Sequence, residues 1–244
     1  MKGSSILKET QKLSFKEGLR DGIPIGLGYL SVSFSFGISA VSKGISWLAA
    51  TIISMTNLTS AGQVAGLTII SAAGTLFEMA LAQLIINMRY SLMSLSLSQR
   101  LDSSFTLPHR FLASFGITDE IFAAASGKGR DITPAYMYGL ISLPFVCWSL
   151  GTLLGGIAGS VMPEILRNSL GIAIYGMFIA IFIPPARKSA GVLVTVAAAA
   201  GLSCCFRFVP LFEQVSSGFA VIICNLAASA AAAVLFPRKE AEQE

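Results

Sequence analysis

The sequence predicts an all-α, polytopic helical membrane protein with about six full transmembrane helices plus two short broken or re-entrant segments. Of its 244 residues, 54% are hydrophobic and only 12% are charged, whereas soluble domains carry about 25% charged residues. Several apolar runs reach about 20 residues, the length that a helix needs to cross the hydrocarbon core of a bilayer. A soluble fold would need a core far larger than this chain can enclose.

The elements follow in order from a polar N-terminal stretch that carries five basic residues. This stretch lacks the short apolar region and the small-residue cleavage site of a signal peptide. We therefore expect a cytoplasmic N-terminal segment at 1–21, a single transmembrane transport domain at 22–236 and a cytoplasmic tail at 237–244. The full spans are expected at 23–41, 64–86, 134–159, 165–183, 190–208 and 215–236.

Two further apolar segments, 45–62 and 111–126, are too short to cross the bilayer as single helices. Polar breaks interrupt them at 57–63 and at 118–120. Non-helical backbone at membrane depth persists only where it is sheltered or lines a cavity, and a pair of short, interrupted segments is the sequence pattern of a transporter's binding site. The pair therefore indicates transport across the membrane.

The distribution of basic residues distinguishes two topologies, because lysine and arginine favour the cytoplasmic side of membrane proteins. If both short segments return to the side that they left, 14 of the 17 basic residues lie in the cytoplasm, and Lys43, Arg167 and Arg207 lie outside. If both segments cross fully, the count falls to 11 of 17. The charges favour the re-entrant arrangement, and both arrangements place the N- and C-termini in the cytoplasm.

The chain lacks the residues that several kinds of chemistry require. The four cysteines lie in apolar runs, with neither metal-ligand spacing nor a disulfide framework. The single histidine, His109, follows Pro108 in a charged stretch where we expect it to be solvated. There is no phosphate-binding Gly-x-x-x-x-Gly-Lys-Ser/Thr motif, and the basic residues are too scattered for nucleic acid. We expect no enzymatic activity, no cofactor and no metal, with transport driven by an ion gradient.

A set of short motifs indicates a family. In order along the chain these are Gly-Ile-Pro-Ile-Gly-Leu-Gly-Tyr at 22–29, Phe-Gly at 36–37, Ser-Ala-Gly-Gln at 60–63, Asn-Met-Arg at 87–89 and Thr-Asp-Glu at 118–120. In this order and spacing the chain resembles the AzlC-type branched-chain amino-acid exporter family, by motif over the first 150 residues and by hydropathy and length beyond them.

The resemblance implies an inner-membrane permease, the large subunit of an AzlC/AzlD pair, that exports leucine, isoleucine and valine and sometimes methionine. It also implies a partner, a small hydrophobic AzlD-type subunit with several spans of its own. The alternative hypothesis is a membrane-embedded structural or accessory subunit of a transport complex, whose partner carries the substrate.

Charged candidates each allow two interpretations. Glu78 lies inside an apolar run, where an acid is costly, so it could bind the substrate ammonium or carry the coupling proton, or it could pair structurally with another helix. Asp119, beside Glu120, could have the same functions or could be a solvated cap following Thr118. Arg89 could be an anchor that extends to the membrane surface, or a partner of Asp119.

Uncharged candidates lie at the two places where a helix should be interrupted. Pro24, Gly26 and Gly28 could open the first span so that free backbone N–H groups meet a carboxylate, or could let helices pack closely. The break at 57–63 could bind a zwitterion or could be a tight turn. We expect an apolar pocket between the first span and this break, with Phe34, Phe36 and Met55 in its lining. The remaining candidate residues are Asn57, Ser60, Gly62, Gln63 and Asn87.

Overall fold

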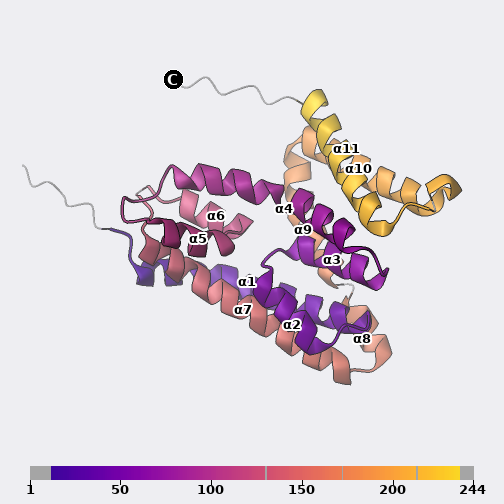
Figure 1. The fold of residues 1–244 in the computed structure, drawn as a ribbon, viewed down its shortest axis with the longest axis horizontal. Coiled ribbons are helices and arrows are strands. Elements are labelled where there is room, and N and C mark those ends of the chain that lie inside the picture. Colours follow the sequence, from indigo (N-terminus) through magenta and orange to yellow (C-terminus); the bar gives the residue numbers. More distant parts are fainter. Residues whose placement is uncertain (1–11, 130, 172, 213, 237–244) are drawn as a thin grey trace, which may run out of the picture. The chain divides into compact units, whose positions relative to one another are not determined.

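The computed structural model describes residues 12–129, 131–171, 173–212 and 214–236, and this part of the chain contains helices and no strand (Figure 1). Four of the described helices are long and apolar enough to cross a membrane. The predicted all-α polytopic membrane fold is therefore confirmed. The elements are α1 (Phe15–Ser42), α2 (Trp47–Thr56), α3 (Ser60–Ser71), α4 (Leu76–Ser98), α5 (Leu107–Phe115), α6 (Asp119–Ser126), α7 (Pro134–Val161), α8 (Glu164–Gly171), α9 (Ala173–Lys188), α10 (Ala190–Phe208), the 3₁₀ helix η1 (Pro210–Phe212) and α11 (Ser217–Leu235).

The four long helices, α1, α7, α10 and α11, correspond to four of the six expected spans. The other two expected spans, 64–86 and 165–183, each fall on two helices: α3 with the first part of α4, and α8 with α9. The prediction of one continuous helix over 64–86 was therefore wrong. The predicted breaks in the short segments are present, since α2 ends before residue 57 and α6 begins only after Thr118.

The interruption between α3 and α4 has a local cause in the sequence. Ala73 adopts a left-handed conformation with φ of 52°, and the N–H of Gly74 donates to the carbonyl of Ile69, 2.9 Å away, which closes the end of α3. Thr75 and Glu78 then start α4 as a capping box: the N–H of Thr75 donates to Glu78 Oε2, and the N–H of Glu78 donates to Thr75 Oγ1. α4 continues to Ser98, through positions expected to form a polar connection.

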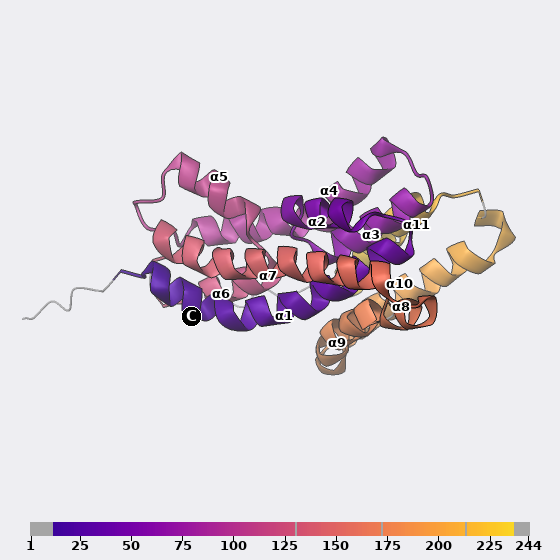
Figure 2. The ribbon, with the colours of Figure 1, turned by 90° about the horizontal axis from the view of Figure 1, so that it is seen from below.

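The chain divides into two compact units, and the first comprises residues 12–31 and 89–149 of the described chain. Within it, the first part of α1 and the first part of α7 lie side by side and run in the same direction (Figures 1 and 2). Small residues make this close approach possible: a Cβ added at Gly22 would lie 2.9 Å from the carbonyl oxygen of Leu140. The buried core of this unit is Leu13, Leu97, Phe105, Ala113, Ile121, Ala125, Ile132, Tyr136, Met137 and Leu140.

The second unit comprises the described residues of 32–88 and 150–236. One of its buried clusters joins the second half of α1 to α2 and α3 through Phe36, Ala50 and Leu67. Another joins α3, α4 and α11 through Ile69, Ala82 and Ile222. α10 and α11 pack against each other, and α11 also packs against α3. These contacts bring the predicted break at 57–63 beside residues of α1 and α4.

Candidate functional site

A cavity in the second unit holds several of the predicted site residues. Its volume is about 260 Å³, and none of the described residues that line it is charged. Its apolar lining comes from α1, α2, α3 and α4, and its polar lining consists mainly of side-chain amides. We call it the amide cavity; its lining residues are Phe36, Ile53, Thr56, Asn57, Gly62, Gln63, Gly66, Leu67, Ile70, Met79 and Gln83.

The break at 57–59 is part of this site because it ends α2 and starts α3. Asn57 follows α2 in an extended conformation, and Thr59 caps α3 by accepting the N–H of Gly62 at its hydroxyl, 3.3 Å away. The helix begins at Ser60, so Gly62 and Gln63 lie in its first turn rather than in the break itself. The uncharged polar interruption that the sequence predicted is therefore real but shorter.

Gly62 allows Gln83 to reach across from α4. The Nε2 of Gln83 donates to the carbonyl oxygen of Gly62 at 2.7 Å, and a Cβ at residue 62 would come within 2.6 Å of Gln83 Oε1. That oxygen accepts a hydrogen bond from Nδ2 of Asn87, 3.1 Å away. Asn87 Oδ1 is buried and has no hydrogen-bond partner among the residues that the structure describes. The row of amides thus ends on a buried acceptor.

Gln63 belongs to a second polar row that joins three helices. Its Nε2 donates to Ser54 Oγ at 2.7 Å, and Ser54 Oγ lies 2.6 Å from Thr152 Oγ1 of α7. Only 2% of Gln63 is exposed, and Ser54 and Thr152 are fully buried. Buried polar groups that are hydrogen-bonded in this way fix the positions of the elements that carry them. The row therefore holds α2 and α3 against α7 on one side of the amide cavity.

Not every predicted pocket residue lines the cavity. Phe36 does, whereas Phe34, Met55 and Ser60 are not among its lining residues, and Met55 is exposed. Met79 and Gln83 line it and were missed. Their signal in the sequence was the spacing of four from residue 79 to 83 to 87, which places three side chains on one helical face.

The first span is not opened at its proline and glycines. α1 is one continuous helix, with Pro24 inside it, which favours close helix packing, the second of the two interpretations, over an opened span. Within the first unit, a Cβ at Gly26 would lie 3.1 Å from Cys147 Sγ, so Gly26 lets α7 pack closely. Gly28 faces open space. Of these two glycines, only Gly26 therefore serves helix packing.

Glu78 lies in the first turn of α4 rather than in the middle of a span, and only 3% of it is exposed. Besides its capping-box bond to Thr75, its Oε1 accepts the N–H of Gly218, 2.8 Å away, and the hydroxyl of Ser216. Ser216 is the N-cap of α11. One carboxylate therefore satisfies donors at the N-termini of both α4 and α11, where a negative charge is stabilising. This geometry corresponds to the second interpretation of Glu78, a structural pairing with another helix.

The first unit carries a separate charged cluster. Arg89 Nη1 lies 2.7 Å from Asp119 Oδ2, with both side chains about half exposed, so the hypothesis that Arg89 pairs with Asp119 is confirmed. Thr118 caps α6, as predicted. The hydroxyl of Tyr29 lies 2.6 Å from both Thr118 Oγ1 and Glu120 Oε2. Because a tyrosine has one proton to donate, it donates to the carboxylate and accepts from the threonine.

His109 is not in a solvated loop. It lies in α5, and its Nδ1 is 2.7 Å from the hydroxyl of Tyr138 on α7. Its ring is part-buried and also meets Phe105 edge to face. The helix was missed because the stretch is charged and polar, but its proline is well accommodated in the first turn of a helix.

The comparisons with known proteins concern the same part of the chain. The family model described as AzlC protein matches residues 24–162, a range that contains the amide cavity and the charged cluster. The chain belongs to the AzlC family. Its motifs at 22–29, 36–37, 60–63, 87–89 and 118–120, which carried the resemblance, lie in or beside this matched range.

Two relatives extend the similarity. The chain is 28% identical to the inner membrane protein YgaZ of Escherichia coli over 87% of this chain and 88% of that protein. It is 29% identical to an uncharacterized membrane protein of Archaeoglobus fulgidus over 70% of this chain and 75% of that protein. No solved structure matches significantly. The family and the membrane-protein relatives support a membrane transporter.

Proposed function

We propose that this AzlC-family protein exports branched-chain amino acids, such as leucine, isoleucine and valine, across the cytoplasmic membrane. The observation that carries the proposal is the amide cavity, whose 260 Å³ is below the range of about 300–1,000 Å³ for pockets that hold drug-sized ligands. A small aliphatic side chain suits the apolar wall of Phe36, Leu67 and Met79. Each buried methylene contributes about 0.8 kcal/mol, so discrimination among the three amino acids should be tenfold or less per methylene.

The amides suit the backbone end of an amino acid. A side-chain amide presents both donors and an acceptor, so Asn57, Gln63 and Gln83 can meet a carboxylate and an ammonium without placing a net charge in the cavity. Asn87 does not line the cavity, but its Nδ2 bonds to Gln83 Oε1 and holds that lining amide in place. None of the described lining residues is charged, and burying an unpaired charge is costly. Lysine and glutamate are therefore poor substrates.

The charged candidates divide between two roles. Asp119 and Arg89, which are paired and half exposed, are proposed as the ion-coupling or gating pair that responds to an ion gradient. Glu78 accepts bonds at two helix N-termini, and its charge is proposed to hold α4 and α11 together rather than to move with the substrate.

The small AzlD-type subunit is part of the same proposal, with both termini of this chain in the cytoplasm. The resemblance to AzlC-type exporters implies this partner. The alternative, an accessory subunit whose partner alone carries the substrate, predicts export by the small subunit without this chain.

Export of preloaded, labelled leucine tests the proposal, with this chain and the small subunit expressed singly and together. Met79→Trp should fill the amide cavity and lower export at least tenfold at matched membrane levels. Met55→Trp is the matched control, because Met55 is exposed and does not line the cavity; it should export normally. Normal export by Met79→Trp, or equal loss in both variants, would remove the cavity from the transport path.

A further inference from the structure

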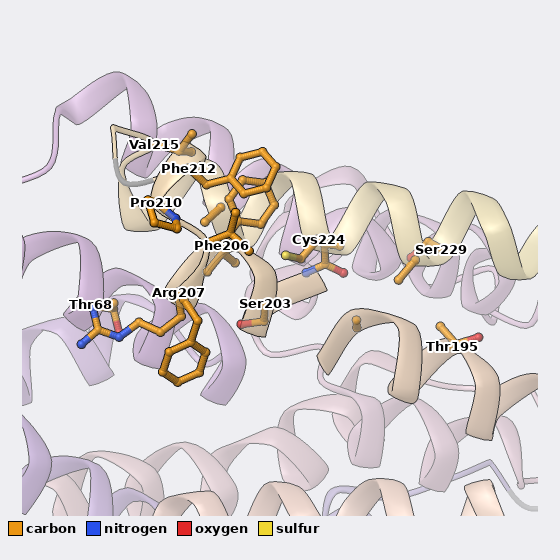
Figure 3. A pocket seen from close by; sticks show the side chains of 17 residues that line it. Thr68, Thr195, Ser203, Phe206, Arg207, Pro210, Phe212, Val215, Cys224 and Ser229 are labelled. Atoms are coloured by element: carbon orange, nitrogen blue, oxygen red, sulfur yellow. The ribbon is translucent and has the colours of Figure 1, made fainter. Parts of the chain in front are cut away.

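A larger cavity lies between α10, α11 and α3 in the second unit, and its volume is about 670 Å³ (Figure 3). Residues 195, 199, 203 and 207 of α10 all line it, and their spacing of four places them on one face of the helix. At 1.5 Å per residue they cover about 18 Å of helix. Thr195, Ala199 and Ser203 are small, and on α11 the lining includes Cys224 and Ala228. The cavity is therefore an elongated and largely apolar groove.

One end of the groove is different. Arg207, in the last turn of α10, is the one charged side chain among the described residues that line it. Figure 3 shows it extending toward Thr68 of α3. No ion pair of Arg207 is present in the described part of the chain. Phe206 and Phe212 lie at the same end, with their ring centroids 4.8 Å apart. An arginine and aromatic rings at the end of an apolar span are typical of the membrane–water interface.

We propose that this groove binds a phospholipid with an anionic headgroup. Arg207 contacts the phosphate at the interface, and an acyl chain lies between α10 and α11 along the small side chains. Basic pockets between transmembrane helices bind anionic headgroups on the cytoplasmic side of membranes, and Arg207, which the expected topology places outside, makes the same kind of contact in the outer leaflet. The groove is less suited to an amino acid, because its volume of about 670 Å³ is more than twice the 260 Å³ of the amide cavity. None of the described residues that line the groove is an acid to pair with the ammonium of phosphatidylethanolamine, so phosphatidylglycerol should bind better. The inference does not depend on the proposed substrate.

Native mass spectrometry of the purified full chain, with either lipid added to the detergent, tests the proposal. The wild type should retain phosphatidylglycerol in preference to phosphatidylethanolamine. Arg207→Gln should lower retention about fivefold, which corresponds to about 1 kcal/mol for one basic residue beside an anionic lipid. Arg187→Gln is the matched control, since Arg187 lies in the last turn of α9 and does not line the groove; it should retain lipid as the wild type does.

Two more variants keep the test decisive if Arg207→Gln folds poorly. Arg207→Lys should keep most of the retention because the charge remains, and Ala199→Phe should lower it by filling the groove below an intact Arg207. Equal retention by Arg207→Gln and the wild type would overturn the proposal. So would equal loss in Arg187→Gln, no preference between the lipids, or displacement of the lipid by leucine, which would make the groove a substrate site.

Discussion

The double capping role of Glu78 predicts what its replacement by glutamine should do. The carboxylate accepts bonds from the N–H of Thr75, the N–H of Gly218 and the hydroxyl of Ser216. A glutamine amide offers one acceptor oxygen and one NH₂ group. If the oxygen keeps the bonds to the donors of α11, the NH₂ group faces the N–H of Thr75, so two donors oppose each other. Bonds to a charged acceptor contribute about 1 kcal/mol more than neutral ones. Over three bonds, Glu78→Gln should lower the free energy of unfolding by about 3 kcal/mol.

The measurement is unfolding of the purified protein by titrated denaturing detergent, followed by helical circular dichroism. Glu164→Gln is the matched control, because Glu164 lies in the first turn of α8 and is exposed; surface changes of this kind are usually within about 0.5 kcal/mol. Glu78→Asp should also destabilise, because the shorter side chain cannot reach donors on both helices. If Glu78→Gln unfolds like the wild type while its leucine export falls tenfold, the carboxylate acts on protons or substrate and the capping argument is wrong.

Three further predictions concern the amide cavity, the charged cluster and the topology. Gly62→Ala should displace the Gln83 side chain, since the added Cβ would lie 2.6 Å from its Oε1; leucine export should fall, and a normal rate would show that the bond between them is dispensable. If the pair gates transport, Arg89→Asp and Asp119→Arg should each abolish export, and the double exchange should recover part of it. The free energy of unfolding should change by no more than about 1 kcal/mol, because the pair is half exposed. A single cysteine at Ser104, which is exposed, in a cysteine-free variant should be protected from an impermeant reagent added outside; labelling would exclude the re-entrant topology.

The polar breaks predicted at 57–63 and 118–120 could be located because Asn57, Thr59 and Thr118 are polar residues that favour helix ends and caps. The structure confines the non-helical backbone to 57–59 and 116–118. The break between α3 and α4 was missed because its sequence, Ala-Ala-Gly-Thr at 72–75, is small and nearly apolar, so hydropathy continues through it. The sequence does contain a signal for this break, because Thr75 and Glu78 have the spacing of a capping box. Glu78 was instead interpreted as an acid inside an apolar span.

Pairings between distant parts of the chain were beyond any local pattern. Ser54 and Thr152 are 98 positions apart, and Glu78 and Gly218 are 140 apart. Neither serine nor threonine is unusual in a membrane helix, so nothing in their own surroundings predicted a buried bond. The pairing of Arg89 with Asp119 was among the hypotheses because both are charges in breaks or at span ends, where few alternatives exist. Sequence reasoning thus identified Glu78, Arg89 and Asp119 as charges that need partners, but it named the partner only for Arg89 and Asp119. It did not find the bond between the ordinary hydroxyls of Ser54 and Thr152.

The length of α3 has a consequence for how deep the amide cavity lies. Ala72 and Ala73, just beyond its C-terminal end, are exposed non-helical backbone, which bilayer hydrocarbon does not tolerate, so that end belongs at an aqueous surface. From there the 12 residues of α3 rise about 18 Å, at 1.5 Å each, against a hydrocarbon thickness of about 30 Å. The opposite end, where buried Leu58 and Thr59 interrupt the helix, therefore lies well below the membrane surface. A solute that reached the amides would have travelled roughly half the distance across the bilayer while still surrounded by protein.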